Sequence, residues 1–580
     1  MKYHFFLGLL FTFFIVSNAT AQQVFIKFVS PTKNQTTVSS KRQFITGTTC
    51  KECSITINAT EIKVWPTGVF VAEVNLNIGD TSFLLTATDL KGFKTSQTFF
   101  YKYQLPEKEK AVESNTVAYW RIEPQGDLLL KAGDKLRMTL KTIPNATVKL
   151  ANGFELKEVL VKDSTGVKGI YKGEYMVTAN DGLFTIEQQR LKAIVTTSDQ
   201  QHIEATTKSS YATMLPLVLQ TKGKLPYLLL GLGEDRLGGT KMGYLDSMVK
   251  LNAVSKVGDK YCVQLTKHRQ AYIEEQHVTV SNNGSFSPAS LTNSMRVWGD
   301  SLYDYVSLIL YERLPYQSFQ QINPSVIIVD VFGATANTNW LTQMQSITEI
   351  KTVTYEQKED DLFRITIQLN HQQHWGHSIY YNGTNLVVRV KHQPKSFLLK
   401  NLIIGVDAGH GGDNKGAFGI SGIMEKNMTL LVAKELQLAL EAEGATVIMT
   451  RTKDTLYENH DRYTFFKEKN PDLLVSIHLN SSADPVRIKG VSTYYKHTGY
   501  QTLTQAILKQ MLGMGLKEFG NVGNFNFILN GFTEFPNVLV ETVFISHPED
   551  ETNILNPAYR KQMADKIVQG IKDWLQLSKE

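Results

Sequence analysis

The fold of the last third of the chain is decided by residues 402–412, which read LIIGVDAGHGG. The apolar first half of this stretch is typical of a strand that is covered on both faces. A helical pattern follows over residues 427–443 and ends at Gly444, a natural C-terminal stop. Because further apolar strands and helices alternate after it, we predict a helix-flanked, twisted α/β sheet over residues 400–580.

Three of the apolar strands end on a polar side chain, namely His410, His478 and Glu541, and Glu425 lies just before the helix. In open α/β sheets, functional side chains gather at the carboxyl ends of the strands. We expect His410, Glu425 and His478 to bind zinc, because this set leaves one position open for water. Zinc lowers the pKa of a bound water to about 7 and polarises a carbonyl group. Glu541 is then available to carry a proton from that water to a leaving amine.

Each of these residues also has an ordinary structural interpretation. A lone histidine at a strand end is more often structural than catalytic. Glu425 alone would be an acid favoured by the dipole at the start of a helix, and Glu541 alone would be a buried salt-bridge partner. The metal-site hypothesis therefore rests on the combination of the four residues.

The sequence around these residues resembles a known family. Residues 405–417 (GVDAGHGGDNKGA) look like the opening of the N-acetylmuramoyl-L-alanine amidases of the amidase 3 type. The segments that follow in that family's order are residues 422–426, 476–480, 490–495, 538–541 and 544–550. The resemblance implies that His410, Glu425 and His478 hold one zinc ion per catalytic domain and that Glu541 is the catalytic glutamate. It also implies hydrolysis of the amide that joins N-acetylmuramic acid to L-alanine in peptidoglycan.

The chain departs from the family pattern at two places. Residues 547–550 read HPED where the family often has NPED, and residues 520–524 lack the basic residues often found there. These departures concern the preference for the stem peptide, not the metal chemistry. Some regulated relatives carry an insertion after the second histidine that plugs the site with a helix. We expect no such plug here, because the chain passes soon after Tyr495 into a helical segment over residues 503–512.

The first two thirds of the chain alternate short β-rich runs with turn residues, so we predict a multidomain protein whose N-terminal modules are all β. A charged linker is expected at residues 106–110. One of these modules, over residues 300–396, resembles the AMIN domain in its pattern and in its position before the catalytic domain. The predicted order is an Ig-like β domain over residues 24–104, a β domain of unknown type over 112–222, an SH3-like β domain over 223–285, an AMIN-like β domain over 300–396, and the zinc amidase domain over 400–580.

Two other groups of potential ligands have structural interpretations. His371, His374 and His377 could bind a metal, but a spacing of three residues splits side chains between the faces of a strand, and we see no carboxylate nearby. We therefore expect them at the surface or at a strand end. The pair Cys50 and Cys53 is either a local disulfide or a free pair, since it lacks the helix-start context of a redox motif. Cys262 is predicted to be a buried, apolar side chain.

The start of the chain reads as a cleaved signal peptide over residues 1–21. The apolar run from Phe5 to Val16 is too short to span a bilayer, and the small residues Ala19 and Ala21 fit a signal peptidase site. An uncleaved membrane anchor is the alternative. The rest of the sequence has no apolar run of about 18 residues, so we predict no further transmembrane helix. From the signal peptide we expect a protein of the periplasm or cell envelope.

The composition excludes several other classes. Hydrophobic residues make up 42% of the 580 residues and charged residues 20%, as in folded globular proteins. A net charge of +6 gives no case for nucleic-acid binding. The functional hypothesis is a peptidoglycan amidase of cell-wall remodelling or cell separation, with envelope or division proteins as candidate partners of the β modules. The rivals are a zinc peptidase that cuts within the stem peptide and a catalytically inactive wall-binding scaffold.

Overall fold

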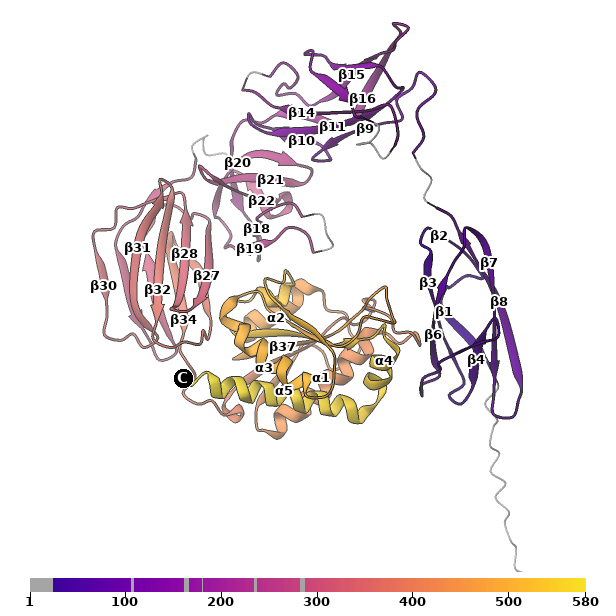
Figure 1. Ribbon diagram of the computed structural model, residues 1–580. Coiled ribbons are helices and arrows are strands. Elements are labelled where there is room, and N and C mark those ends of the chain that lie inside the picture. The colour runs from indigo at the N-terminus through magenta and orange to yellow at the C-terminus, as the bar shows by residue number, and fades with distance from the viewer. Residues whose placement is uncertain are drawn as a thin grey trace, which may run out of the picture.

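The computed structural model describes residues 24–105, 109–160, 166–179, 181–233, 237–281 and 287–579. The predicted signal peptide over residues 1–21 lies outside this described part, as do residues 106–108 of the predicted linker. Within it, strands dominate up to residue 391, and every α-helix lies after residue 424 (Figure 1). The predicted order, all-β modules followed by an α/β domain, is therefore confirmed.

The first module is a sandwich of a three-stranded and a five-stranded sheet. Ile45, Phe70, Leu85 and Phe99 meet between the two sheets as its buried core. Cys50 and Cys53 form a disulfide at one edge, which answers the question that the sequence left open. The strands are β1 (Ile26–Ser30), β2 (Gln35–Val38), β3 (Arg42–Thr49), β4 (Ser54–Ile57), β5 (Thr60–Ile62), β6 (Val69–Asn75), β7 (Gly79–Thr88) and β8 (Lys94–Tyr103).

The two segments that follow are joined by strand pairing into one continuous sheet system. Its connecting pair is the antiparallel contact between Leu128–Leu130 and Lys250–Val257. Cys262 is buried, as predicted. The strands are β9 (Tyr119–Glu123), β10 (Leu128–Leu130), β11 (Lys135–Lys141), β12 (Thr147–Leu150), β13 (Glu155–Glu158), β14 (Ile170–Met176), β15 (Gln189–Thr196), β16 (His202–Thr213), β17 (Leu217–Thr221), β18 (Tyr227–Leu229), β19 (Lys241–Tyr244), β20 (Lys250–Val257), β21 (Lys260–Thr266), β22 (Arg269–Glu274) and β23 (Val278–Val280).

The next module packs a five-stranded sheet against a four-stranded one. Its buried residues form one apolar cluster with those of the segment from Leu219 to Val278, so the two modules share a core. Strands β33 and β34 form a hairpin around Asn382 and Gly383. The strands are β24 (Ser290–Leu291), β25 (Met295–Gly299), β26 (Tyr303–Leu308), β27 (Tyr316–Ile322), β28 (Ser325–Phe332), β29 (Ala334–Thr335), β30 (Leu341–Gln343), β31 (Ile350–Glu359), β32 (Leu362–Leu369), β33 (His377–Asn382) and β34 (Asn385–Lys391).

His377 lies at a strand end, as predicted, because it is the first residue of β33, but the predicted surface location is wrong for His374. His374 and His377 are 1% and 2% exposed, not at the surface, because residues 373–377 pack against the C-terminal domain. The His377 backbone N–H donates to Thr533 O at 2.7 Å, and Gln373 Nε2 donates to Gly499 O at 2.8 Å. A carboxylate is also present, since His371 Nδ1 lies 2.6 Å from Glu349. This segment is a docking surface between two modules, and the described residues show no candidate metal cluster there.

The C-terminal domain is a six-stranded sheet in the order β36-β35-β37-β40-β38-β39, in which only the β38–β40 pair is antiparallel. Helices α1, α3 and α5 pack together over one face, and α2 covers the other (Figure 1). None of the helices in the described part is long and apolar enough to span a membrane. The elements are β35 (Ile403–Ala408), α1 (Glu425–Ala442), β36 (Thr446–Met449), α2 (Asn459–Lys469), β37 (Leu473–Asn480), β38 (Val491–Tyr494), α3 (Gln501–Leu512), β39 (Glu518–Val522), β40 (Asn537–Phe544), α4 (Pro548–Leu555) and α5 (Pro557–Leu577).

The first module docks onto the C-terminal domain beside α4 (Figure 1). Ile420 is 4% exposed because it packs against Val69 and Val71 of β6, and burial of such a side chain stabilises the contact by about 1.5–3 kcal/mol. Arg42 adds a hydrogen-bonded ion pair to Asp484 at 2.7 Å. The connection over residues 481–490, which contains Asp484, has no helix.

Candidate metal centre

A glycine-rich turn follows β35 and carries His410. His410 has a φ of +61°, a conformation that non-glycine residues adopt only when their surroundings enforce it. Two buried arginines supply that enforcement. Arg451 donates to Ala408 O and Gly409 O, both at 2.9 Å. Arg462 donates to Ala408 O at 2.9 Å and also to His410 O.

Glu425 is the first residue of α1, where the helix dipole favours a negative charge. Its carboxylate accepts hydrogen bonds from Ala417 N at 2.8 Å and Leu479 N at 3.0 Å. Burial raises the pKa of Glu425, but hydrogen bonds from His410 and His478 outweigh that effect and hold the pKa well below its ordinary value. Glu425 is therefore an ionised carboxylate in a buried position.

The structure brings together the three residues that the sequence predicted as metal ligands. One ligand atom from each of His410, Glu425 and His478 lies within 4.8 Å of the others. His410 Nε2 is 3.0 Å and His478 Nδ1 is 3.1 Å from the same carboxylate oxygen, Glu425 Oε1. Three donor atoms from three separate elements thus converge on one point.

The surroundings of the three side chains fit a metal ion. Asn414 Oδ1 lies 2.8 Å from His410 Nδ1, which places a proton on Nδ1 and turns Nε2 toward Glu425 Oε1, where a metal ion would take the place of the Nε2 proton. Glycines allow the close packing, because a Cβ on Gly409 would clash with the His478 ring and one on Gly416 would lie 2.5 Å from Glu425 Oε2. Two neutral nitrogens and one carboxylate are the donor set of a catalytic zinc site.

Glu541 lies on β40, and the parallel register pairs it directly with His478 on β37. Paired residues of neighbouring strands project from the same face of a sheet. On its other side, Glu541 is paired with Ser492 of β38. The candidate catalytic glutamate therefore stands next to a candidate ligand, at the carboxyl end of the sheet.

A buried ion pair stabilises the turn that carries His410. Arg462 Nη1 lies 2.5 Å from Asp407 Oδ1, and their side chains are 2% and 0% exposed. Burial raises the pKa of Asp407, but the charge of Arg462 and hydrogen bonds from Ser476 and Thr450 hold that pKa below its ordinary value. The same guanidinium thus neutralises Asp407 and positions the backbone of His410.

Several of these supporting residues were not predicted from the sequence. Asn414 could have been found, because it lies four residues after His410 inside the glycine-rich motif. The sequence pattern did not predict a role for Arg451 or Arg462, nor the helix α2 that carries Arg462. Phe527 was also missed, although its ring packs edge-on against His478 with centroids 5.3 Å apart.

Two protein-family models and several known proteins match parts of this chain. A protein-family model described as N-acetylmuramoyl-L-alanine amidase matches residues 404–573, and one described as AMIN domain matches residues 294–392. The chain is 34% identical over 191 residues to the probable cell wall amidase LytH of Staphylococcus aureus, a match that covers 33% of this chain and 64% of that protein. The chain thus spans less than two thirds of the length of that relative.

Similar solved structures include two N-acetylmuramoyl-L-alanine amidases. The N-acetylmuramoyl-L-alanine amidase from Clostridium difficile 630 is 30% identical, with a TM-score of 0.29 and coverage of 30% of this chain and 96% of that one. The N-acetylmuramoyl-L-alanine amidase AmiC2 of Nostoc punctiforme is 31% identical, with a TM-score of 0.29 and coverage of 30% and 97%. Both similarities are confined to about a third of this chain.

Proposed function

We propose that this chain, whose residues 404–573 match the family model described as N-acetylmuramoyl-L-alanine amidase, is a zinc-dependent hydrolase of peptidoglycan. The bond that it cuts is the amide between N-acetylmuramic acid and the L-alanine of the stem peptide. The observation that carries this proposal is the convergence of His410, Glu425 and His478 on one point, with Glu541 paired to His478.

In this proposal His410 Nε2, His478 Nδ1 and the Glu425 carboxylate hold the metal. Bound zinc supplies a Lewis acid for the scissile carbonyl and lowers the pKa of a coordinated water. Glu541 accepts the proton of the attacking water and delivers it to the nitrogen of L-alanine as the C–N bond breaks. Asn414 keeps the His410 ring in the required tautomer, and the two arginines keep its backbone in place.

The rival function is a zinc peptidase that cuts within the stem peptide. Mass spectrometry of purified peptidoglycan treated with the full chain separates the two. We expect intact stem peptides with a free L-alanine amino end and glycan strands without stems, and we expect a chelator to stop their release until zinc is restored. Fragments that begin at a later residue of the stem would show a peptidase instead, and the absence of any product would support an inactive scaffold.

We make two further proposals, one on the location of the protein and one on its β modules. We propose that residues 1–21 direct export to the periplasm or cell envelope, where the chain acts in wall remodelling or cell separation. We keep the domain division of the sequence as a proposal, and we propose in addition that the SH3-like module includes β17 (Leu217–Thr221), because β17 pairs with β20 and β23. The β modules are proposed to bind peptidoglycan or envelope proteins.

A further inference from the structure

One side chain of the C-terminal domain makes hydrogen bonds to a β module that is distant in the sequence. Asn526 Oδ1 accepts a hydrogen bond from the Lys241 backbone N–H at 3.1 Å. Asn526 Nδ2 donates to Leu237 O at 3.0 Å and to Gly239 O at 2.9 Å. Both ends of the amide are therefore used by the backbone of residues 237–241, which precede Asn526 by more than 280 positions. We call residues 237–241 the module loop.

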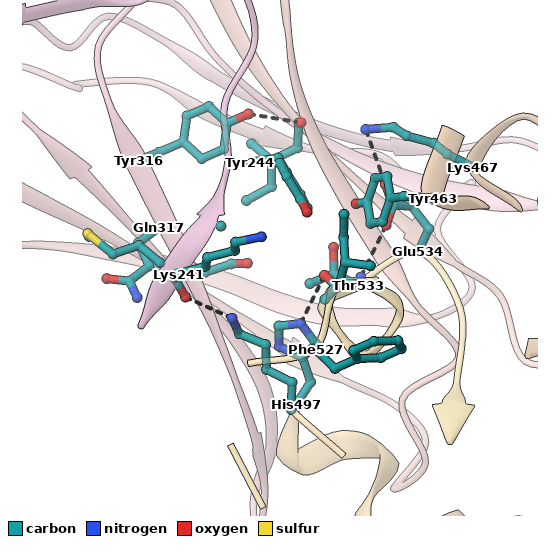
Figure 2. Close-up of a pocket in the computed structure, with 17 residues that line it drawn as sticks. Lys241, Tyr244, Tyr316, Gln317, Tyr463, Lys467, His497, Phe527, Thr533 and Glu534 are labelled. Carbon is teal, nitrogen blue, oxygen red and sulfur yellow. Dashed lines mark hydrogen bonds and ion pairs between the residues drawn. The ribbon is translucent and has the colours of Figure 1, made fainter. Parts of the chain in front are cut away.

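A lysine strengthens the same junction. Lys496 Nζ donates to Lys241 O at 2.8 Å and approaches Asn526 Oδ1 at 3.5 Å. Figure 2 shows Lys241 and Tyr244 of the β module in the same pocket as His497 and Phe527 of the C-terminal domain. Lys241 Nζ lies 4.6 Å from the centre of the Tyr227 ring, which fixes the lysine within its own module. The module loop is thus held by Asn526 and Lys496 of the C-terminal domain and, through Lys241, by Tyr227 of its own module.

The neighbours of Asn526 lead directly to the candidate metal centre. Phe527 packs edge-on against His478, with ring centroids 5.3 Å apart at 81°. Phe525 contacts Tyr494 at 4.5 Å and Phe527 at 6.3 Å. The two phenylalanine rings are only partly buried, so they form an aromatic surface next to His478. Asn526, which lies between them, connects this surface to the module loop.

We propose that the module loop contributes to substrate binding at the amidase site. The loop fixes Asn526 and so holds Phe525 and Phe527 as a substrate-binding surface beside His478. Asn526 is then a positioning residue. The inference rests on the proposed function for the identity of the substrate, the glycan and first stem residues of peptidoglycan. It adds that the catalytic domain needs its β module to bind that substrate well.

The isosteric variant Asn526→Asp tests this inference in the full chain. It replaces the donor Nδ2 with an oxygen that faces Leu237 O and Gly239 O, so the contact becomes repulsive. For soluble glycan–peptide fragments of peptidoglycan we expect KM to rise about tenfold with little change in kcat. Zinc content should stay the same, and hydrogen exchange should accelerate in residues 237–241 and 525–528. Asn524→Asp is the matched control, because Asn524 is exposed in the same segment, and it should change none of these.

A second variant approaches the contact from the module. A Cβ at Gly239 would clash with Gly231 O, so Gly239→Ala must reshape the module loop without touching the catalytic domain. Its effect on KM should match that of Asn526→Asp, and the double variant should be no worse than either single variant. Unchanged KM and exchange in Asn526→Asp, or additive effects in the double variant, would overturn the inference. A wild-type chain that releases no stem peptides would contradict the proposed function instead, and the exchange measurement would still test the contact.

Discussion

Replacing Glu541 with glutamine is expected to lower kcat for stem-peptide release by about a thousandfold, the range of a lost general acid–base. The change keeps the shape of the side chain but removes its ability to accept and return a proton. Glu541 is paired with His478 in the sheet and is not among the three converging ligand atoms. We therefore expect the variant to keep its zinc and its binding to peptidoglycan. Both are measured together with the rate, by metal analysis and by sedimentation with sacculi.

The control is Glu518→Gln, which makes the same change at an exposed position of β39 in the same domain. Its kcat should equal that of the wild type. A Glu541→Gln chain that retains a tenth or more of the wild-type kcat would show that another group moves the proton, since the smallest general-base contribution is about a hundredfold.

Replacing Arg462 with glutamine is expected to destabilise the C-terminal domain by about 3–5 kcal/mol, because it leaves the charge of Asp407 buried without its partner. The side chains of Arg462 and Asp407 are 2% and 0% exposed, and the guanidinium also binds two carbonyls of the turn that carries His410. Hydrogen exchange of the β37 amides reports the free energy of unfolding of this domain. The turn should also lose its hold on His410, so zinc affinity should fall.

Two further variants separate the buried charge from general damage. Arg487→Gln, whose side chain is 65% exposed, should change the free energy of unfolding by less than about 0.5 kcal/mol. Adding Asp407→Asn to Arg462→Gln removes the unpaired charge and should recover part of the loss. An Arg462→Gln chain as stable as the Arg487→Gln chain would refute the role assigned to this ion pair.

The four site residues could be predicted because each lies at the end of a local pattern. His410, His478 and Glu541 follow apolar strands, and Glu425 precedes an apolar helical stripe. Helix α2 has no such stripe: its sequence NHDRYTFFKEK buries only Arg462, Tyr463 and Phe466. Because hydrophobic periodicity is the main signal for a helix, both α2 and the buried arginine on it escaped prediction.

Contacts between modules could not be predicted for a different reason. Periodicity indicates which side chains leave the solvent, but it does not say which distant segment covers them. His374 and His377 were expected at the surface or at a strand end, and their burial depends on residues more than 120 positions later. The hydrogen bonds of Asn526 to the module loop join segments that are equally distant. Such contacts appear only when the chain is folded.

Anomalous X-ray scattering at the zinc absorption edge, from crystals of the zinc-loaded full chain, shows directly whether His410, Glu425 and His478 bind zinc. We expect one peak per chain, with His410 Nε2, His478 Nδ1 and a Glu425 carboxylate oxygen at about 2.0–2.2 Å from it. Crystals of a His478→Ala chain should lack that peak. A strong peak elsewhere in the chain and none among these three side chains would show that they are not the zinc site.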